Sequence, residues 1–533
     1  MNVHLYTTHQ PNCLWKLIKQ FVRLSFLIAL LLSTATVGYA QNDASDGNAP
    51  TKRVFLPLVA SNQDKVASEP METIAADEPL DPSIDTAADY DPILTAESPA
   101  SVEAAGSGTT FFVTKVEDTE DGTCSPVDCS LREASAAAAA DPTTHDNIML
   151  FGGIFPITTK PLQLVNVTLI GVGATQTVLE NVGFILNVPM NTIEIPIVYT
   201  YPPLTPVLNT WVQLEKLTIR NNQFGNPAAG IKHSWGKLTL KNVRIQKHRQ
   251  GISSIPLNLA DSKGIFLYNS DIDTNGKGLV IEQGSGYLEN SVVRNSETLG
   301  LEIRQSNITF ANTTVSSNAG GGIYLQKSTG DIFGSALIFN QQYGIFVNAS
   351  TLNLTNSTVS SNDSTSIAAG LGVDGDGAGL WVGQGSTANL TFVTIAKNKV
   401  NNSTAGLYVS PNGKNTINLQ KSLVADNVRK NGQASDCMGT LISGGYNLFE
   451  STTGCILGGS NTGNIIGTDP KLGTLALNGG TTKNHQPASN SPAVDAIQGA
   501  ACPNVAVDQR NIVRPRDGNS DGVWGCDIGA LER

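Results

Sequence analysis

The sequence is poor in charged residues, in aromatic residues and in long apolar runs. Of its 533 residues, 15% are charged and 6% are aromatic. The net charge of −11 is concentrated in residues 41–108, which hold thirteen acidic and three basic residues, while residues 1–40 carry +3 and the remaining 425 carry −4. A body so close to neutral lacks the basic surface that binds nucleic acid or anionic membranes. We therefore expect neither as a partner.

Cysteine is scarce as well, with seven in the chain. Apart from Cys13, the cysteines fall in three close pairs: Cys124/Cys129, Cys437/Cys455 and Cys502/Cys526. Six cysteines permit 15 sets of pairings, but proximity favours three local disulfides formed in an oxidising compartment. Zinc binding is the alternative, and the C-x4-C spacing without a second nearby pair fits it poorly.

Residues 1–40 have the pattern of an export signal. Three basic residues precede the apolar run Leu24–Leu32, and small residues lead to a cleavage site after Ala40. A retained membrane anchor is the alternative, but the run is short for a span of about 20 residues. After removal of the signal, no later segment is long and apolar enough to span a membrane. The sequence thus predicts a secreted or extracellular protein, with association to the cell surface left open.

Residues 41–108 have the composition of a disordered acidic linker. They contain seven prolines, many Ala and Ser residues, and no apolar periodicity. The apolar segment Val54–Val59 is the exception, and we treat it as a candidate for docking on the folded body.

The chain from residue 264 to residue 409 repeats itself. Four glycines mark the repeat at intervals of 22 residues: Gly278, Gly300, Gly322 and Gly344. Each glycine opens a phrase in which apolar residues alternate with others, which indicates β-strands, and a repeat of this length indicates a solenoid. Insertions at 364–377 and 400–404 interrupt the rhythm, and residues 183–213 form a longer excursion. The residues expected to point inward are Leu279/Ile281, Leu301/Ile303, Ile323/Leu325, Ile345/Val347, Leu380/Val382 and Leu407/Val409.

A second repeated phrase ends in a marker residue that is nearly always asparagine. Stacked asparagines pass amide hydrogen bonds from strand to strand at about 4.8 Å, and asparagine tolerates left-handed bends. We interpret the column as a structural ladder rather than a ligand site, and His248 as a turn residue rather than a catalytic base. The markers are Asn222, His248, Asn275, Asn295, Asn318, Asn340, Asn362, Asn398 and Asn427.

Both ends of the repeat carry motifs of known families. Residues Cys129–Ala134 read C-S-L-R-E-A, and Ser130 with Glu133 forms a capping box that predicts a helix running to Ala140. The motif resembles the bacterial CSLREA domain, which typically precedes a right-handed parallel β-helix of the pectin-lyase-like superfamily. The C-terminal motifs resemble the choice-of-anchor Q domain: Asp469–Gly473, Asn478–Gly480, Ser491–Asp495, Asp508–Arg510, Arg514–Pro515 and Cys526–Ala530. Both resemblances imply an exported bacterial repeat protein, and neither implies a known catalytic activity.

The expected fold is all-β: a right-handed parallel β-helix solenoid with a short N-terminal helical cap and a disulfide-stapled C-terminal cap. The expected divisions are a signal peptide at 1–40, the linker at 41–108, a CSLREA-type cap at 109–150, the parallel β-helix at 151–436 and a choice-of-anchor Q-like unit at 437–533.

The outward second position of the glycine phrase supplies the candidate ligand-binding residues. After Glu302 it carries four successive aromatic residues: Tyr324, Phe346, Trp381 and Tyr408. On the solvent side of a sheet they would form a stripe about 15 Å long, and flat exposed rings are what sugar rings stack against. Packing of the rings across strands, or a segment covering them, are the alternatives. The expected ligand is a polysaccharide or another cell-envelope polymer.

An enzyme is the second hypothesis. Glu282 and Glu302 lie diagonally on neighbouring strands, about 7–8 Å apart at the backbone, a separation suited to acid and base in inverting glycoside hydrolysis. A surface ion pair between Glu282 and Arg304 explains these residues more simply. The Asp-Asp pair and Gly-His-Gly of polygalacturonase-like enzymes are missing, and Asp271 and Asp273 are too isolated to indicate the calcium-binding Asp cluster, with a nearby arginine, of pectate-lyase-like enzymes. We therefore assign no catalytic residue and favour non-catalytic binding over a polysaccharide lyase or glycoside hydrolase, with a structural or adhesive rod as a third hypothesis.

Calcium is the one candidate cofactor. Residues 517–523 match the first half of a Ca²⁺ loop, with Asp517, Asn519, Asp521 and Val523 as candidate ligands. The glutamate expected at position 12 is replaced by Ile528, and a plain Asx-turn loop explains the segment as well. Residues 374–377 form a weaker match. Nothing in the sequence points to a particular oligomeric state.

Overall fold

The computed structural model describes residues 108–158, 160–182, 198–200, 211–222, 229–256, 262–365, 379–502 and 506–533. The expected signal peptide, nearly all of the linker with its apolar segment, most of the excursion at 183–213 and the weak calcium motif at 374–377 lie outside the described residues.

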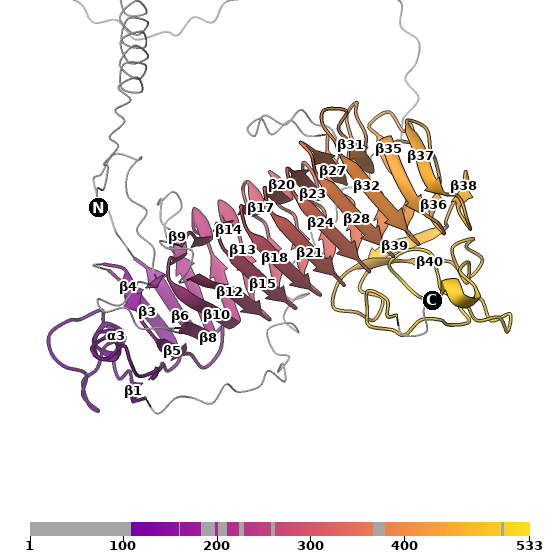
Figure 1. The fold of residues 1–533 in the computed structure, drawn as a ribbon. Coiled ribbons are helices and arrows are strands. Elements are labelled where there is room, and N and C mark those ends of the chain that lie inside the picture. The colour runs from indigo at the N-terminus through magenta and orange to yellow at the C-terminus, as the bar shows by residue number, and fades with distance from the viewer. Residues whose placement is uncertain are drawn as a thin grey trace, which may run out of the picture. The chain divides into compact units, whose positions relative to one another are not determined.

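Parallel strands stack into three long sheets that run side by side along a coil (Figure 1). We call them the polar sheet, the docking sheet, on which the C-terminal residues pack, and the aromatic sheet, which carries the column of aromatic residues. The polar sheet contains β1 (Thr110–Phe112), β2 (Asp146–Met149), β5 (Val167–Ile170), β8 (Trp211–Asn221), β10 (Gly236–Gln246), β12 (Ser262–Tyr268), β15 (Ser285–Glu289), β18 (Asn307–Ala311), β21 (Thr329–Phe333), β24 (Thr351–Thr355), β28 (Thr387–Thr391), β32 (Thr416–Gln420), β35 (Cys437–Gly444) and β37 (Cys455–Ser460). The docking sheet contains β3 (Gly153–Ile157), β6 (Thr177–Asn181), the C-terminal halves of β8 and β10, β13 (Asp271–Asp273), β16 (Val292–Arg294), β19 (Thr314–Ser316), β22 (Ala336–Ile338), β25 (Thr358–Ser360), β29 (Thr394–Ala396), β33 (Leu423–Ala425), β36 (Leu448–Phe449) and β38 (Ile465–Ile466). The aromatic sheet contains β4 (Leu162–Leu164), β7 (Val198–Thr200), β9 (Ala229–His233), β11 (Gln250–Ser254), β14 (Lys277–Glu282), β17 (Leu299–Arg304), β20 (Gly321–Gln326), β23 (Ile345–Asn348), β27 (Leu380–Gly383), β31 (Leu407–Val409) and the start of β35.

The core lies inside the coil, and the predicted inward residues fill it. All twelve are fully buried except Val409, which is 7% exposed. Each turn of the coil, called a rung below, buries its apolar side chains on those of the next, so the core grows with the number of rungs. The structure therefore confirms both the strands and the inner face that the alternation after each glycine predicted.

The asparagine column forms a buried ladder at the corner between the docking and aromatic sheets. Each amide donates from Nδ2 to Oδ1 of the next at 2.8–2.9 Å, from Asn318 through Asn340, Asn362 and Asn398 to Asn427. The same Oδ1 accepts the backbone N–H of the preceding marker, as Asn398 does from Asn362 at 3.0 Å. The repeat glycines make room for this column, because a Cβ on Gly300 would lie 2.6 Å from Nδ2 of Asn318.

Two markers were assigned wrongly from the sequence. Asn295 was taken as the marker before Asn318, but the strands pair Val293 with Val315, so the ladder residue of that rung is Ser296, whose N–H donates to Asn318 Oδ1 at 3.0 Å. The rung is one residue shorter in the docking sheet than the 22-residue repeat, and matching asparagine to asparagine shifted the alignment. Asn295 instead takes the left-handed bend (φ 54°) that precedes each ladder position. The second wrongly assigned marker is Asn222, which is exposed and therefore does not belong to the buried ladder.

The two ends of the column differ from its middle. His248 begins it: its N–H donates to Asn275 Oδ1 at 2.9 Å and its Nε2 lies 3.4 Å from the carbonyl of Ile219. At the other end Asn427 donates its N–H and Nδ2 to Oδ1 of Asp436, at 3.1 and 2.8 Å. Burial raises the pKa of Asp436 to about 7, although these donors oppose the shift. A buried carboxyl thus takes the place of the next amide.

We expect Asp436 to make the protein less stable as the pH rises. Its folded pKa of about 7 lies above the ordinary value of about 3.9, so its stabilising contribution is complete below about pH 4 and is lost as the pH rises through 7. Asp436→Asn lacks this titration. The free energy of unfolding of the variant minus that of the unaltered chain should therefore become more positive between about pH 4.5 and 8, by up to about 4 kcal/mol. The difference between their melting temperatures should change in the same direction.

Thermal unfolding of both proteins at matched pH values measures this difference. The buried histidines have the opposite pH dependence, because burial lowers the pKa values of His233, His248 and His485 to about 4. Both proteins share these histidines, so their contribution cancels. A difference that stays constant across the pH range contradicts the prediction.

A short helix covers the first rungs. α3 (Leu131–Ala139) begins at Ser130, which accepts the N–H of Glu133 at 3.1 Å, while Glu133 accepts the N–H of Ser130 at 2.8 Å. Arg132 reaches out of the helix to Asp118 at 2.7 Å, and both side chains are buried. The expected capping box is present, and the helix ends one residue before Ala140. The CSLREA motif thus fixes the helix to the loop before it.

The coil continues beyond residue 436, and the chain after it turns back. β35, β36, β37 and β38 extend the parallel ladders to Ile466. Residues 467–533, called the C-terminal segment below, lie along the docking sheet with β39 (Leu472–Ala476) antiparallel to β40 (Asn484–Pro487), followed by a single 3-10 turn (Gly499–Ala501) (Figure 1).

Hydrogen bonds tie the C-terminal segment to several rungs. Thr482 Oγ1 donates to the carbonyl of Gly334 at 2.8 Å, and Thr358 Oγ1 donates to Gln509 Oε1 at 2.6 Å. Further along, the N–H of Ala530 donates to Thr394 Oγ1 at 3.0 Å. An apolar layer of Phe392, Leu423, Ala493, Ile497 and Ile528 lies between the segment and the sheet.

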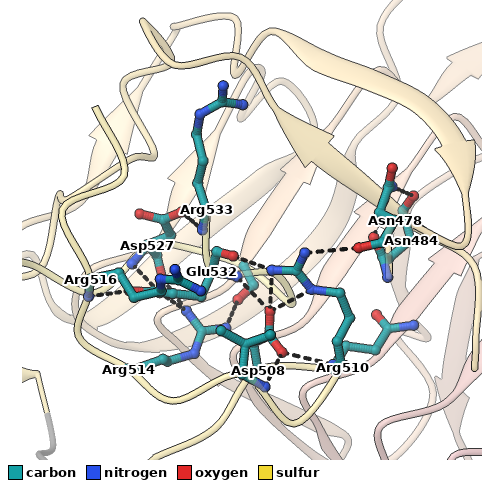
Figure 2. A network of polar contacts seen from close by, with 12 residues as sticks. Asn478, Asn484, Asp508, Arg510, Arg514, Arg516, Asp527, Glu532 and Arg533 are labelled. Carbon is teal, nitrogen blue, oxygen red and sulfur yellow. Dashed lines mark hydrogen bonds and ion pairs between the residues drawn. The ribbon is translucent and has the colours of Figure 1, made fainter. Parts of the chain in front are cut away.

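A buried network of charges holds the C-terminal segment in shape (Figure 2). Arg514 and Glu532 are both fully buried and pair at 2.7 Å. Arg514 also donates to the carbonyls of Asp527 and Gly529, and Arg510 pairs with Asp508 at 2.8 Å. Burial raises the pKa of Glu532 to about 7. Three of the C-terminal motifs, Asp508–Arg510, Arg514–Pro515 and Cys526–Ala530, thus contribute to this network, and Glu532 joins it from outside them.

Three disulfides join Cys124–Cys129, Cys437–Cys455 and Cys502–Cys526, the pairs expected from proximity in the sequence. Within the described ranges, no helix has the length and apolarity needed to cross a bilayer.

Candidate functional site

The predicted aromatic column is present on the outer side of the aromatic sheet. The strands pair Glu302 with Tyr324, Tyr324 with Phe346, Phe346 with Trp381 and Trp381 with Tyr408. One further strand extends the column to Met438, which is 46% exposed. The sequence did not indicate this residue, because the repeat is interrupted before it. The column is therefore continuous over six strands.

The rings of this column stack on one another. Ring centroids are 5.5 Å apart for Tyr324 and Phe346, 3.9 Å for Phe346 and Trp381, and 6.2 Å for Trp381 and Tyr408, with interplanar angles of 23°, 6° and 18°. Ring faces thus point along the coil and ring edges point outward. Phe346 is only 3% exposed, while the other three rings are half-buried. The stacking therefore occupies most of the flat surface that the sequence led us to expect for sugar rings.

Tyr343 closes one side of the stack. It is 4% exposed, and its ring centroid lies 5.4 Å from that of Phe346. The ring covers Gly321, where a Cβ would lie 2.6 Å from a ring carbon and where φ is +120°, so glycine is required there on two counts. Spacing alone did not reveal Tyr343, because it precedes the repeat glycine rather than following it.

Glu302 lies at the head of the column between two cations. Its carboxylate accepts hydrogen bonds from Lys277 at 2.5 Å and from Nε of Arg304 at 2.8 Å. Burial would raise the pKa of Glu302, but Lys277 and then Arg304 outweigh it and lower the pKa. The prediction of a surface ion pair between Glu282 and Arg304 is wrong. Their backbones are in register, but the guanidinium of Arg304 pairs with Glu302 on its own strand.

This arrangement does not suit Glu302 to act as a general acid. A general acid needs a raised pKa, and the two cations keep this carboxylate ionised. A carboxylate with its charge neutralised on both sides instead fixes the positions of Lys277 and Arg304. Arg304, with 45% of its side chain exposed, is the group left to meet a ligand.

A cavity of about 380 Å³ lies next to Met438 at the far end of the column. Its lining includes Thr404, Arg429, Gln433, Met438 and Thr453. Arg429 is placed there by a small parallel sheet of β26 (Asp363–Ser364), β30 (Lys399–Val400) and β34 (Val428–Arg429), formed where the insertions leave the coil. Its Nε donates to the carbonyl of Ser403 at 2.9 Å. The sequence indicated the insertions but not that they would pair.

The candidate calcium residues lie in an exposed loop of the C-terminal segment. Asp517 accepts the N–H groups of Asp521 and Gly522 at 3.1 and 3.0 Å, and Asp521 accepts that of Val523 at 2.8 Å. Asn519 accepts the N–H of Asp521 at 2.9 Å. These bonds are those of Asx turns. Among the described residues, no three His, Cys, Asp or Glu side chains come together as a metal site, so calcium binding stays a prediction.

Comparison with known proteins identifies the fold. Residues 255–422 match the family described as "Right handed beta helix region". A comparison of the sequence with curated proteins gives no match. Among solved structures, XylC in complex with xylose is 10% identical and covers 79% of this chain and 98% of its own, with a TM-score of 0.52.

Two further structures are less similar in shape. The A-module of the mannuronan C-5 epimerase AlgE4 from Azotobacter vinelandii is 14% identical and covers 64% of this chain and 92% of its own, with a TM-score of 0.42. Pectate lyase Pel9A is 13% identical and covers 80% and 96%, with a TM-score of 0.37. At 10% identity, the similarity to XylC bears on the fold alone. The chain is a right-handed parallel β-helix, as the repeat predicted.

Proposed function

We propose that the chain is an exported, non-catalytic protein that binds an extended polysaccharide along the aromatic sheet. The observation that carries the proposal is the continuous column from Tyr324 to Met438, which leads into an open cavity beside Arg429. Concave sites with a few directed polar groups next to apolar surface are the usual form of small-ligand sites. One sugar unit in the cavity and further units along the column would use both features.

The stacked rings determine how a sugar chain can lie. The rings turn their faces toward one another, so we place the sugar chain against their edges, with the partly exposed Met438 at the far end of the column. Along the stack, ring edges and Arg304, Gln326 and Asn348, which form the adjacent outward column, face the ligand. These side chains supply hydrogen-bond donors and acceptors for hydroxyl groups.

Export rests on the sequence of residues 1–40 and on the three disulfides, which form in oxidising compartments. We propose secretion, with attachment at the cell surface as an extension of it. The resemblances of the two ends to the CSLREA and choice-of-anchor Q domains support the same location.

Replacing Trp381 by alanine tests the aromatic column. Truncating an anchor aromatic costs about 2 kcal/mol or more at a binding site, so we expect affinity for a soluble polysaccharide to fall at least about tenfold. Trp524→Ala is the matched control, because Trp524 is 65% exposed in a distant loop. Affinity electrophoresis against a panel of polysaccharides, with and without Ca²⁺, measures binding, and assays for reducing ends and unsaturated products run on the same samples.

Each outcome separates the hypotheses. Retention without product, weakened by Trp381→Ala and not by Trp524→Ala, supports the proposal. Product formation that Glu302→Gln abolishes would establish a lyase or hydrolase instead. An absence of both retention and product across the panel would leave a structural or adhesive rod.

A further inference from the structure

The outer face of the polar sheet carries a regular array of uncharged side chains. Three successive strands present the pattern Thr-x-Asn-x-Thr or its close variant. The array consists of Thr351, Asn353 and Thr355 on β24, Thr387, Asn389 and Thr391 on β28, and Thr416, Asn418 and Gln420 on β32. Each residue is in register with its counterpart on the next strand. Neighbouring positions are therefore about 4.8 Å apart across strands and about 6.6 Å apart along them.

The asparagines of this array form a second ladder, on the outside of the coil. Asn353 donates from Nδ2 to Asp331 Oδ1 at 2.7 Å, Asn389 donates to Asn353 at 2.8 Å, and Asn418 donates to Asn389 at 2.8 Å. Each amide that both donates and accepts within the ladder keeps one N–H and one oxygen lone pair for the outside. Because the ladder fixes the amides, these groups point outward at regular intervals.

The threonines on both sides are also held in position. A β-branched side chain has few allowed rotamers on a strand, so the hydroxyl and methyl groups keep a constant height above the sheet. Eight of the nine residues are half-buried by their neighbours, and Gln420 is exposed. A ligand that binds here would therefore order few side chains, and side-chain ordering is one of the main costs of association.

The array is uncharged in a protein whose C-terminal segment is rich in ion pairs. None of its nine residues is ionisable, although the asparagine ladder begins at the carboxylate of Asp331 on the strand before the array. The C-terminal segment leaves the array open, since the contacts described above lie on the docking sheet. At the far end of the same face, Ile442 and Ile456 are 39% and 69% exposed.

A polar hollow borders the array on the side of the aromatic sheet. It encloses about 400 Å³ and crosses three rungs, with Ser306, Ser328 and Ser350 at equivalent positions of its lining. Thr329 and Thr351, from the first threonine column, form its edge. The three serines are buried and their hydroxyl groups already donate to the backbone carbonyls of Arg304, Gln326 and Asn348, so the hydroxyl groups that the hollow offers to a ligand are those of Thr329 and Thr351.

We propose that this face binds the ordered surface of a neutral, hydroxyl-rich polysaccharide. Amide and hydroxyl groups at fixed intervals match sugar hydroxyls, threonine methyl groups match sugar C–H groups, and the rung spacing is comparable with one sugar unit of an extended chain. Individual contacts of this kind are weak, so the match in two directions supplies the affinity. This site is separate from the aromatic column and does not depend on it.

The test is co-sedimentation of the exported chain with microcrystalline cellulose and with crystalline chitin. Thr387→Lys/Thr391→Lys places two ammonium groups on the array without changing inward residues. We expect the bound fraction at low protein concentration to fall about tenfold or more, because an unpaired charge is costly to desolvate. Thr123→Lys/Val127→Lys, in the exposed loop before α3, adds the same charge elsewhere and should leave binding unchanged.

A second variant guards against a change in folding. Thr387→Val/Thr391→Val keeps the shape and β-propensity and removes only two hydroxyls, and we expect binding to the solid to fall about threefold, roughly 0.6 kcal/mol. Trp381→Ala should not alter co-sedimentation, while it weakens binding of soluble chains. Failure of the two proposals is therefore distinguishable.

Three outcomes overturn the inference. The first is sedimentation with neither solid, and the second is sedimentation that both threonine variants leave intact. The third is capture by growing ice crystals without capture by either polysaccharide, which would identify the array as a surface for ordered water.

Discussion

Asn362→Ala should destabilise the coil by about 3–6 kcal/mol. Its amide donates to the carbonyl of Leu337 at 3.0 Å and to Asn398 at 2.9 Å, and accepts from the N–H and the Nδ2 of Asn340 at 3.1 and 2.9 Å. All of these groups are buried, so alanine leaves donors and acceptors without partners, at about 1–3 kcal/mol each. Denaturant unfolding followed by circular dichroism measures the loss.

Asn389→Ala is the matched control for this effect. Asn389 occupies the same kind of ladder, with bonds of 2.8 Å on both sides, but at the outer surface where water replaces the lost amide. We expect a cost below about 1 kcal/mol. Asn362→Ser should fall between the two, because Ser296 already occupies one rung of the inner column. Equal losses for Asn362→Ala and Asn389→Ala would show that burial of the ladder contributes nothing.

Arg514→Met should release the C-terminal segment from the docking sheet. The substitution keeps an unbranched apolar stem, shortens the side chain and removes the charge that faces Glu532 at 2.7 Å, in a site where neither side chain is exposed. A buried carboxylate without its partner costs about 3–5 kcal/mol. We expect faster cleavage within residues 467–533 under limited proteolysis, and an earlier unfolding transition for this segment than for the coil.

Two further variants decide whether the lost ion pair is the cause. Arg516 is exposed, and only its backbone N–H bonds to Glu532, at 3.0 Å, so Arg516→Met should change little. Adding Glu532→Gln to Arg514→Met removes the unpaired charge and should recover part of the loss, as in a double-mutant cycle. Cleavage that is as fast for Arg516→Met as for Arg514→Met would contradict the assignment.

The sequence predicted those parts of the fold that repeat. Inward alternation after Gly278, Gly300, Gly322 and Gly344 predicted the core strands, because every rung places the same positions inside. The asparagine ladder followed from the same regularity. The prediction failed at Ser296, because the docking-sheet part of that rung is one residue shorter. The neighbouring asparagine, Asn295, therefore does not occupy the ladder position.

The parts that do not repeat were beyond the reach of periodicity. Spacing predicted that Tyr324, Phe346, Trp381 and Tyr408 share a column, but the orientation of the rings depends on side-chain torsions that spacing does not determine. The contact of Thr358 with Gln509 joins residues 151 positions apart, and no repeat links them. The pairing of Arg304 with Glu302 was missed for the same reason: register places both glutamates within reach, and local geometry selects between them.

The C-terminal segment changes how the coil is expected to unfold. In a stack where each rung contacts only its neighbours, stability is a sum of local terms and the ends open first. Here one segment bonds to Gly334, Thr358, Thr394 and Lys421, which lie on successive rungs, so those rungs cannot open one at a time. The C-terminal half of the rod should therefore unfold as a single cooperative block, and hydrogen exchange should report one common opening energy across β22 to β33 where a bare solenoid would show a gradient.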